Sequence, residues 1–133
     1  MCIEAYAAAL LDGEGHIRVQ SGANFGLDII FGMSDREPLD LLASKWGGNV
    51  LTPASQVTRT GRRMHRWIIS GSYAIAFLED VRPWVQGKAK QVELALKYPL
   101  TGSKGRRGNK LPLEVFEARR QIGSRLRELR AVR

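Results

Sequence analysis

The alternation of apolar and polar residues divides the start of the chain into a helix and a hairpin. Residues 2–12 read as a short helix, and over 16–20 polar and apolar residues alternate at the two-residue period of a strand. A turn signal over 21–24 precedes a second alternating run over 25–31. The two runs predict a β-hairpin with one apolar face.

A second helix and a second pair of strands are predicted downstream. Ser34 and Glu37 have the spacing of a capping box, and the glycines of 47–49 stop the apolar stripe that follows them. Two further strands are expected at about 50–58 and 63–70, with a turn between them. This order repeats the helix, strand and strand of the first segment.

Helices and a linker complete the prediction. A third helix follows the fourth strand, a fourth runs from about 84 to 98, and a last helix covers 111–131. We therefore predict an α+β fold with a core over 1–99, a basic, glycine-rich linker over 100–110 and a basic C-terminal helix over 111–133.

The charge of the chain is concentrated toward its C-terminal end. The net charge is +8, of which +7 lies in residues 101–133 with their 10 Lys or Arg and 3 Glu. This excess favours a polyanionic partner such as nucleic acid. No apolar run reaches the ~20 residues that cross a bilayer, and the start of the chain lacks a signal-peptide pattern. The single cysteine, Cys2, permits no internal disulfide. We expect a cytoplasmic or organellar protein without a membrane partner, not a secreted one.

The predicted first helix ends in an unusual way. Asp12 and Glu14 would be repelled by the partial negative charge of a helix C-terminus, by roughly 0.3–1 kcal/mol each when exposed. A compensating positive charge, such as a divalent metal ion, is therefore expected beside them. Ala5, Ala8 and Ala9 share one helical face with Asp12, and such small side chains let a second helix come close.

This segment carries a family resemblance. The string A-A-A-L-L-D-G-E-G over 7–15 resembles the signature of the LAGLIDADG homing endonucleases, with Ala7 and Ala9 replacing the usual leucine and glycine. The predicted element order and the run P-W-V-Q-G-K-A-K-Q over 83–91 resemble the family as well. The resemblance covers residues 3–98 and implies an α-β-β-α-β-β-α core with an antiparallel, saddle-shaped sheet.

The resemblance also implies a metal-dependent site that cuts phosphodiester bonds. Glu14, eighth in the signature, corresponds to the metal-binding carboxylate, with the carbonyl of Gly13 as a further ligand. Hard oxygen ligands of this kind suit Mg²⁺. Lys88 corresponds to the lysine that lines the catalytic pocket. Asp12 is counted with the catalytic residues, but we expect it to serve the helix end and the interface first.

Polar side chains on one face of the sheet are the expected DNA contacts, because arginine suits guanine edges and glutamine or asparagine suits adenine edges. The alternation over 62–69 allows two phases, one exposing residues 63, 65 and 67 and the other 62, 64 and 66. By comparison with the family we favour the first, with residue 62 in the turn. Further basic residues add phosphate contacts. The predicted DNA-binding residues are Arg18, Gln20, Asn24, Asp28, Arg59, Arg62, Arg63, His65, Trp67, Lys90, Lys104, Arg106 and Arg107.

One signature supplies one such acid per chain, whereas two DNA strands must be cut. The resemblance therefore implies a homodimer whose first helices meet through Ala5, Ala8, Ala9 and Asp12. The predicted function is that of a site-specific, Mg²⁺-dependent homing endonuclease, which makes a staggered double-strand break in a long, nearly palindromic DNA target.

Two alternatives stay open. Family members often place a glutamine near the end of strand two, where this chain reads G-M-S-D over 32–35, so Ser34 or Asp35 would take a polar role there. A protein of the same fold that binds nucleic acid without cutting it is the first alternative, acting on intron RNA as a splicing cofactor or as a DNA-binding regulator. A basic α/β domain with a chance motif is the second.

Overall fold

The computed structural model describes residues 2–22, 25–53, 61, 63–100 and 112–131. Helices and strands follow one another in the predicted order, which confirms the α+β fold class. The elements are α1 (Ile3–Glu14), β1 (Gly15–Val19), β2 (Leu27–Met33), α2 (Glu37–Trp46), β3 (Asn49–Leu51), β4 (His65–Ser70), α3 (Gly71–Val81), the short 3-10 helix η1 (Arg82–Trp84), α4 (Ala89–Ala95) and α5 (Leu113–Ala131).

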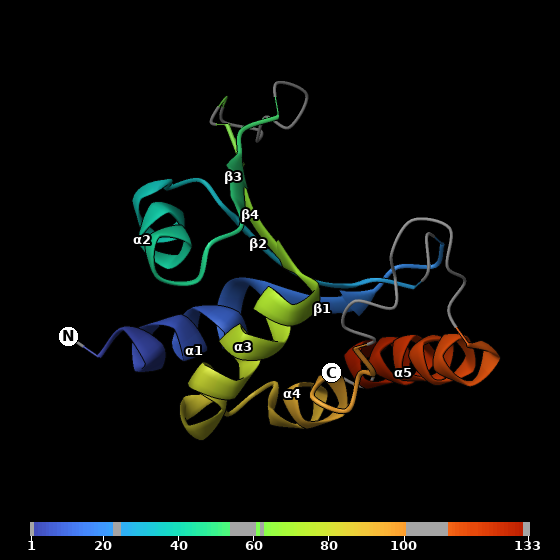
Figure 1. Cartoon of the computed structure of the whole chain (residues 1–133). Coiled ribbons are helices and arrows are strands. Elements are labelled where there is room, and N and C mark those ends of the chain that lie inside the picture. The colour runs from blue at the N-terminus through green and yellow to red at the C-terminus, as the bar shows by residue number, and fades with distance from the viewer. Residues whose placement is uncertain (1, 23–24, 54–60, 62, 101–111, 132–133) are drawn as a thin grey trace.

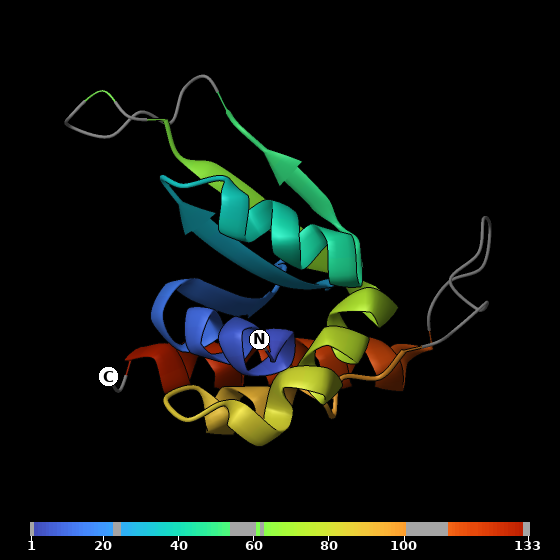
Figure 2. The same cartoon turned by 90° about the vertical axis from the view of Figure 1, so that its left-hand side faces the viewer.

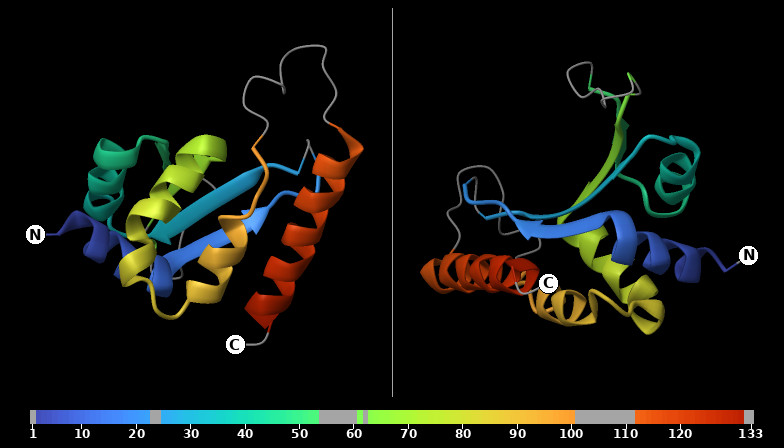
Figure 3. Two further views of the ribbon diagram at one scale, coloured as in Figure 1. Left: turned by 60° about the horizontal axis from the view of Figure 1, so that its bottom comes forward. Right: turned by 180° about the vertical axis from the view of Figure 1, so that it is seen from behind.

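The four strands form one curved antiparallel sheet in the order β1-β2-β4-β3. Figure 1 shows the helices gathered on one side of this sheet, and the view from behind in Figure 3 shows the same arrangement. The other side, which we call the open face, carries no helix (Figure 1). Strand β1 and strand β3 are the two edges of the sheet.

An aromatic cluster forms the centre of the core between the sheet and helices α2 and α3. The Phe77 ring packs edge-on against Trp46 and Trp67, with centroids 4.8 and 5.3 Å apart, and Phe31 lies 5.3 Å from Trp67. The indole of Trp67 also donates a 2.8 Å hydrogen bond to the carbonyl of Gly47. Aromatic pairs of this kind add about 0.5–1.5 kcal/mol each beyond the area they bury.

This cluster corrects the predicted phase of strand β4. Trp67 is completely buried, and His65, two residues away on the same side of the strand, shares a 2.7 Å hydrogen bond with Thr52. Residues 63, 65 and 67 were predicted to face DNA, and for Trp67 this is wrong, because packing Trp67 into the core outweighs keeping it in solvent. Arg66 therefore lies on the open face, opposite Gly32 of β2. His65 is half-buried, and its contact with DNA stays a prediction.

Several element boundaries also differ from the prediction. Helix α2 begins at Glu37 behind Arg36, which makes no side-chain cap, so the capping box of Ser34 and Glu37 is wrong. Helix α4 begins only at Ala89, because Pro83 lies in η1 and residues 85–88 form a loop. Part of the predicted strand 50–58 lies outside the described residues.

Helix α5 packs along the edge strand β1 and beside α4, as Figure 2 and the left panel of Figure 3 show. Leu126 is completely buried in the common core. A Cβ atom on Gly123 would lie 3.0 Å from the Cβ of Val19, so glycine lets the helix approach the strand closely. The guanidinium of Arg119 stacks over the Tyr98 ring at 4.7 Å and so fixes α5 to the chain that follows α4.

Candidate functional site

The end of α1 is fastened to the loop before α4 by three hydrogen bonds, which we call the α1 clip. The carboxylate of Asp12 accepts one bond from the backbone N–H of Gln86 and one from that of Lys88, each 2.9 Å long. In return, the Nζ of Lys88 donates a 2.8 Å bond to the backbone carbonyl of Asp12. Two segments more than 70 residues apart are thereby held in one geometry.

Lys88 supplies the positive charge that the acidic helix end requires. Its side chain is only 3% exposed, and its ammonium lies at a carbonyl of the last turn of α1, where the helix dipole favours a cation. A metal ion was the compensating charge expected from the sequence, and Lys88 already provides part of that compensation. Lys90, two residues further on, is exposed instead.

Glu14 and Gly13 are both exposed at the end of α1. The helix ends there because Gly15 leaves it in an extended conformation, and a Cβ on Gly15 would lie 2.5 Å from the Leu11 side chain. A Cβ on Gly13, in contrast, would meet no atom of the described chain within 4 Å. Packing within this chain explains the glycine at position 15 but not the one at position 13.

Helix α1 turns a different face outward from the one predicted. Ala8 is completely buried in the core, together with Ala7 and Leu11, so its assignment to a dimer interface is wrong. Its methyl group packs against the chain's own core and leaves no surface for a partner. Ala9 is exposed and Ala5 half-buried, and both lie on the helical face that leads to Gly13.

The described residues hold no group of three or more His, Cys, Asp or Glu side chains that could enclose a metal ion. Within one chain the oxygen ligands at the end of α1 are therefore few. Asp12 directs its carboxylate into the α1 clip, while Glu14, about 200° further around the helix, is exposed. A complete metal site at this tip would need ligands from a second protomer, from a nucleic acid or from water.

The open face of the sheet carries an ordered polar network around Asp28. This carboxylate is only 4% exposed and accepts hydrogen bonds from Gln20, at 2.6 Å, and from the Ser70 hydroxyl, at 2.7 Å. Arg18 lies 3.5 Å from it in an ion pair. The prediction that Asp28 contacts DNA is therefore wrong, because three neighbours already surround its carboxylate. Its effect is to hold Arg18 and Gln20 on the open face.

The start of β1 lies in a positive environment. Burial and the nearby charges of Arg130, Arg18 and Lys88 lower the pKa of His16 below its usual value. His16 is therefore predominantly neutral near pH 7. The cations around it would attract an anion approaching the edge of the sheet.

Comparisons with solved structures identify the fold. No protein-family model matches the sequence, and no curated protein matches it. The homing endonuclease I-CvuI, in complex with the I-CreI target in the presence of 2 mM Mg and with its DNA not cleaved, superposes with a TM-score of 0.72 at 18% identity, covering 95% of this chain and 80% of that one. I-CvuI with its own target and Ca gives 0.61 at 17% identity, covering 92% of this chain and 93% of that one. The archaeal intron-encoded enzyme I-Vdi141I with DNA gives 0.53 at 15% identity, covering 90% and 95%.

The chain has the LAGLIDADG homing-endonuclease fold. The resemblance read from its signature is thus confirmed for the fold. Among the described residues, no helix is long and apolar enough to cross a membrane.

The homing-endonuclease fold brings together some of the predicted site residues and not others. Glu14, Gly13, Asp12 and Lys88 meet at the tip of α1, and Arg18 and Gln20 lie on the open face. Arg63 is exposed. The predictions for Asn24, Arg59, Arg62, Lys104, Arg106 and Arg107 lie outside the described residues.

Sequence reasoning missed two functional candidates. Arg66 was assigned to the disfavoured phase of β4, because each face of that strand mixes apolar and polar residues. Arg130 was treated as part of a separate basic helix, yet its guanidinium donates a 2.6 Å hydrogen bond to the carbonyl of Ile17 in β1. Its spacing of four residues from Leu126 was the available signal.

Proposed function

We propose that this protein is a homodimeric, site-specific DNA endonuclease that uses Mg²⁺. The observation that carries the proposal is the tip of α1, where Glu14 is exposed and the ammonium of Lys88 is held at the carbonyl of Asp12, two residues away along the chain. An exposed carboxylate and a fixed cation at the same helix end, next to a helix-free sheet face, suit the hydrolysis of a phosphodiester bond.

The residues at this tip fit a magnesium ion. The Glu14 carboxylate and the carbonyl of Gly13 would hold it, since both are hard oxygen ligands and both residues are exposed. When bound, Mg²⁺ would activate water and stabilise the leaving oxygen. The chain's own contribution is Lys88, whose ammonium would stabilise negative charge that builds on the phosphate. The α1 clip would keep that ammonium in place.

A second copy of the chain would complete the site. The outward stripe of α1 consists of small residues at Ala5, Ala9 and Gly13, which follow each other at helical spacing, with Cys2 as the N-cap residue before them. A glycine inside a helix costs about 0.5–1 kcal/mol relative to alanine, and nothing in the described part of the chain requires one at position 13. Close approach of a second α1 would explain it and would bring two Glu14 side chains together.

Duplex DNA would lie on the open face of the sheet. Arg18, Gln20 and Arg66 present polar side chains there, and Asp28 fixes the first two in position. Preorganised arginine and glutamine side chains lose less conformational entropy when they bind base edges. The same face carries Ile30 and Ile68 opposite each other, which gives the polar side chains an apolar floor.

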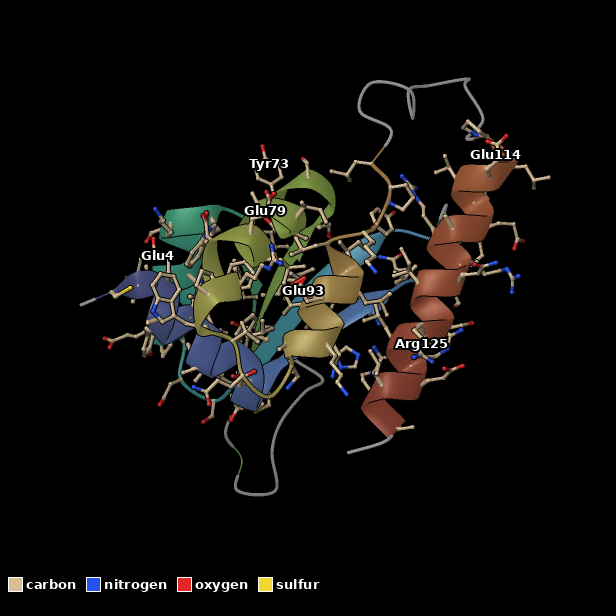
Figure 4. The ribbon with its side chains drawn as sticks, turned by 90° about the horizontal axis from the view of Figure 1, so that it is seen from below. Glu4, Tyr73, Glu79, Glu93, Glu114 and Arg125 are labelled. Carbon is tan, nitrogen blue, oxygen red and sulfur yellow. The ribbon has the colours of Figure 1, made fainter. Side chains whose placement is uncertain are left out.

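The test is cleavage of a plasmid library with and without Mg²⁺. We expect wild-type protein to cut a rare sequence only with the metal, and Glu14→Gln to abolish cutting while DNA binding in Ca²⁺ persists. Glu79→Gln is the matched control, because Glu79 is an exposed glutamate on α3, away from the tip of α1 (Figure 4). Robust cutting by Glu14→Gln would reject the proposed metal role.

One observation favours a second candidate function. Strand β2 ends in Met33 and is followed by Ser34 and Asp35, without the glutamine typical of the family, and Asp35 is exposed. A protein that binds intron RNA or a DNA operator without cutting would tolerate this change. Tight binding to intron RNA combined with no nicking of any DNA in the library would establish this second function instead.

A further inference from the structure

We propose that Arg127 and Arg130 of α5, together with Arg18 of β1, bind a backbone phosphate of duplex DNA at the edge of the sheet. This site rests on the DNA-binding function proposed above. It assigns to α5 a role in binding nucleic acid, in addition to its packing against the core. Three observations carry it: the position of α5, the pairing of its charges and an orphaned donor on Arg18.

The position of α5 brings its last turns to the edge strand. Strand β1 is the first strand of the sheet, and the helix runs along it with Gly123 against Val19. Arg130 then reaches the strand itself, where its Nη1 donates to the carbonyl of Ile17. Since Ile17 follows Glu14 by only three residues, the C-terminal end of α5 is anchored close to the tip of α1.

Two exposed arginines of α5 have carboxylate partners within the helix, whereas two arginines near its C-terminal end have no carboxylate partner among the described residues. Arg120 bonds to Glu117 at 2.8 Å and Arg125 to Glu128 at 3.1 Å, so these exposed arginines are neutralised within the helix. Figure 4 shows Arg125 from the helical side of the molecule. Among the described residues, no carboxylate forms an ion pair with Arg127 or Arg130.

The arginines at the edge repel one another. Burial and the charges of Arg127 and Arg18 lower the pKa of Arg130 from its ordinary value, because all three cations lie within electrostatic range. Within the described ranges, Arg18 has one carboxylate partner, Asp28, whose oxygens also serve Gln20 and Ser70. An anion bound among these arginines would offset the repulsion between their positive charges.

An unused donor points to the chemistry of that anion. The Nε of Arg18 is buried, and the part of the chain that the structure describes offers it no hydrogen-bond acceptor. Buried donors without acceptors are uncommon in native proteins. A phosphodiester group carries several acceptor oxygens. It can accept two parallel hydrogen bonds from an arginine guanidinium, an arrangement that a lysine ammonium cannot provide. A backbone phosphate of duplex DNA at this edge of the sheet would meet these requirements.

The test measures how strongly DNA binding depends on salt. A labelled duplex of random sequence is titrated with wild-type protein and with Arg127→Gln over a range of salt concentrations, without divalent metal. We expect Arg127→Gln to weaken binding to every duplex and to reduce the slope of log K against log salt by about 0.9 for each phosphate that the variant no longer neutralises. Arg125→Gln removes the same charge about 200° around α5 from Arg127, where Arg125 pairs with Glu128, and we expect it to leave the slope unchanged.

Arg130 needs a variant that preserves its structural bond. Because it donates to Ile17, Arg130→Gln could unfold the edge of the sheet, whereas Arg130→Lys keeps the charge and a donor. We expect Arg130→Lys to retain the wild-type melting temperature and salt slope, and the double variant Arg127→Gln/Arg130→Gln to lose more slope than Arg127→Gln alone. An unchanged slope in Arg127→Gln would overturn the proposal.

The outcome separates this inference from the proposed function. If wild-type protein cuts DNA and Arg127→Gln binds duplexes as wild type does, the phosphate site is wrong and the endonuclease stands. If wild-type protein binds no duplex at all, the proposed function fails first. If Arg127→Gln weakens binding to a structured RNA and leaves duplex DNA binding unchanged, the assignment to DNA is overturned.

Discussion

Removing the Asp12 carboxylate should destabilise the protein even though the residue is only half-buried. Asp12→Ala leaves the backbone N–H groups of Gln86 and Lys88 without their acceptor. Hydrogen bonds to a charged group contribute about 1.5–3 kcal/mol each. Because water can reach part of this site, we use the lower end for both bonds and expect a loss of about 3 kcal/mol. Asp12→Asn keeps one acceptor oxygen, so we expect about half of that loss.

Urea and thermal unfolding followed by circular dichroism would measure this loss. For a chain of this length we expect Asp12→Ala to lower Tm by roughly 10 °C, since each kcal/mol shifts Tm by about 4 °C. Glu14→Gln is the matched control: it removes a charge two residues away whose carboxylate forms no part of the α1 clip, and its stability should stay within about 0.5 kcal/mol of wild type. If Asp12→Ala is as stable as Glu14→Gln, the α1 clip does not hold the loop.

The same variants separate structure from chemistry in the cleavage assay. Asp12→Asn should lower the cleavage rate together with Tm, because it loosens the loop that positions Lys88. Glu14→Gln should abolish cleavage and leave Tm unchanged. A stable Asp12→Asn variant without activity would instead assign the Asp12 carboxylate to the reaction itself, in contact with metal or substrate.

Two further predictions concern the two corrected faces. If the proposed dimer forms through α1, Ala9→Leu, at the exposed position, should give a monomer of similar stability in analytical ultracentrifugation. Ala8→Leu overpacks the core and should cost about 1–3 kcal/mol of stability. A dimer that survives Ala9→Leu would place the interface elsewhere. Trp67→Ala should cost about 3–5 kcal/mol in urea unfolding, whereas Arg66→Ala should stay within about 0.5 kcal/mol of wild type and weaken DNA binding; the opposite pattern would restore the predicted phase of β4.

The fold could be predicted from the sequence wherever a single local pattern decided the structure. The hairpin of β1 and β2 follows from two runs that alternate apolar and polar residues over most of their length, and α2 ends where Gly47 adopts a φ of 83° that side chains avoid. The phase of β4 could not be predicted in this way, because both of its faces mix apolar and polar residues. The aromatic partners Phe31 on β2, 36 residues earlier in the chain, and Phe77 on α3 select the face that carries Trp67.

In the candidate site, too, residues that belong to a local sequence pattern could be predicted, and contacts between distant residues could not. The signature located Glu14 and Gly13, because a run of nine residues is a local pattern, and the lysine run located Lys88. The α1 clip and the network around Asp28 depend on pairs that meet only in the folded chain. The docking of Arg130 on β1 likewise joins residues 113 positions apart, and no periodicity within α5 shows what its inner face would meet.

The two acidic residues at the end of α1 therefore have different roles, although they are only two residues apart: Asp12 bonds to its own chain, and Glu14 is exposed. A rotation of about 200° between them turns Asp12 toward its own chain and leaves Glu14 exposed. Lys88 connects these two roles: its backbone N–H is held by the Asp12 side chain, and its ammonium neutralises the helix end from which Glu14 projects. The electrostatic cost of placing two carboxylates at a helix C-terminus is thus offset by a lysine that the proposed reaction also uses. Exchanging Lys88 for methionine should accordingly reduce stability and cleavage together, because both depend on the same buried charge.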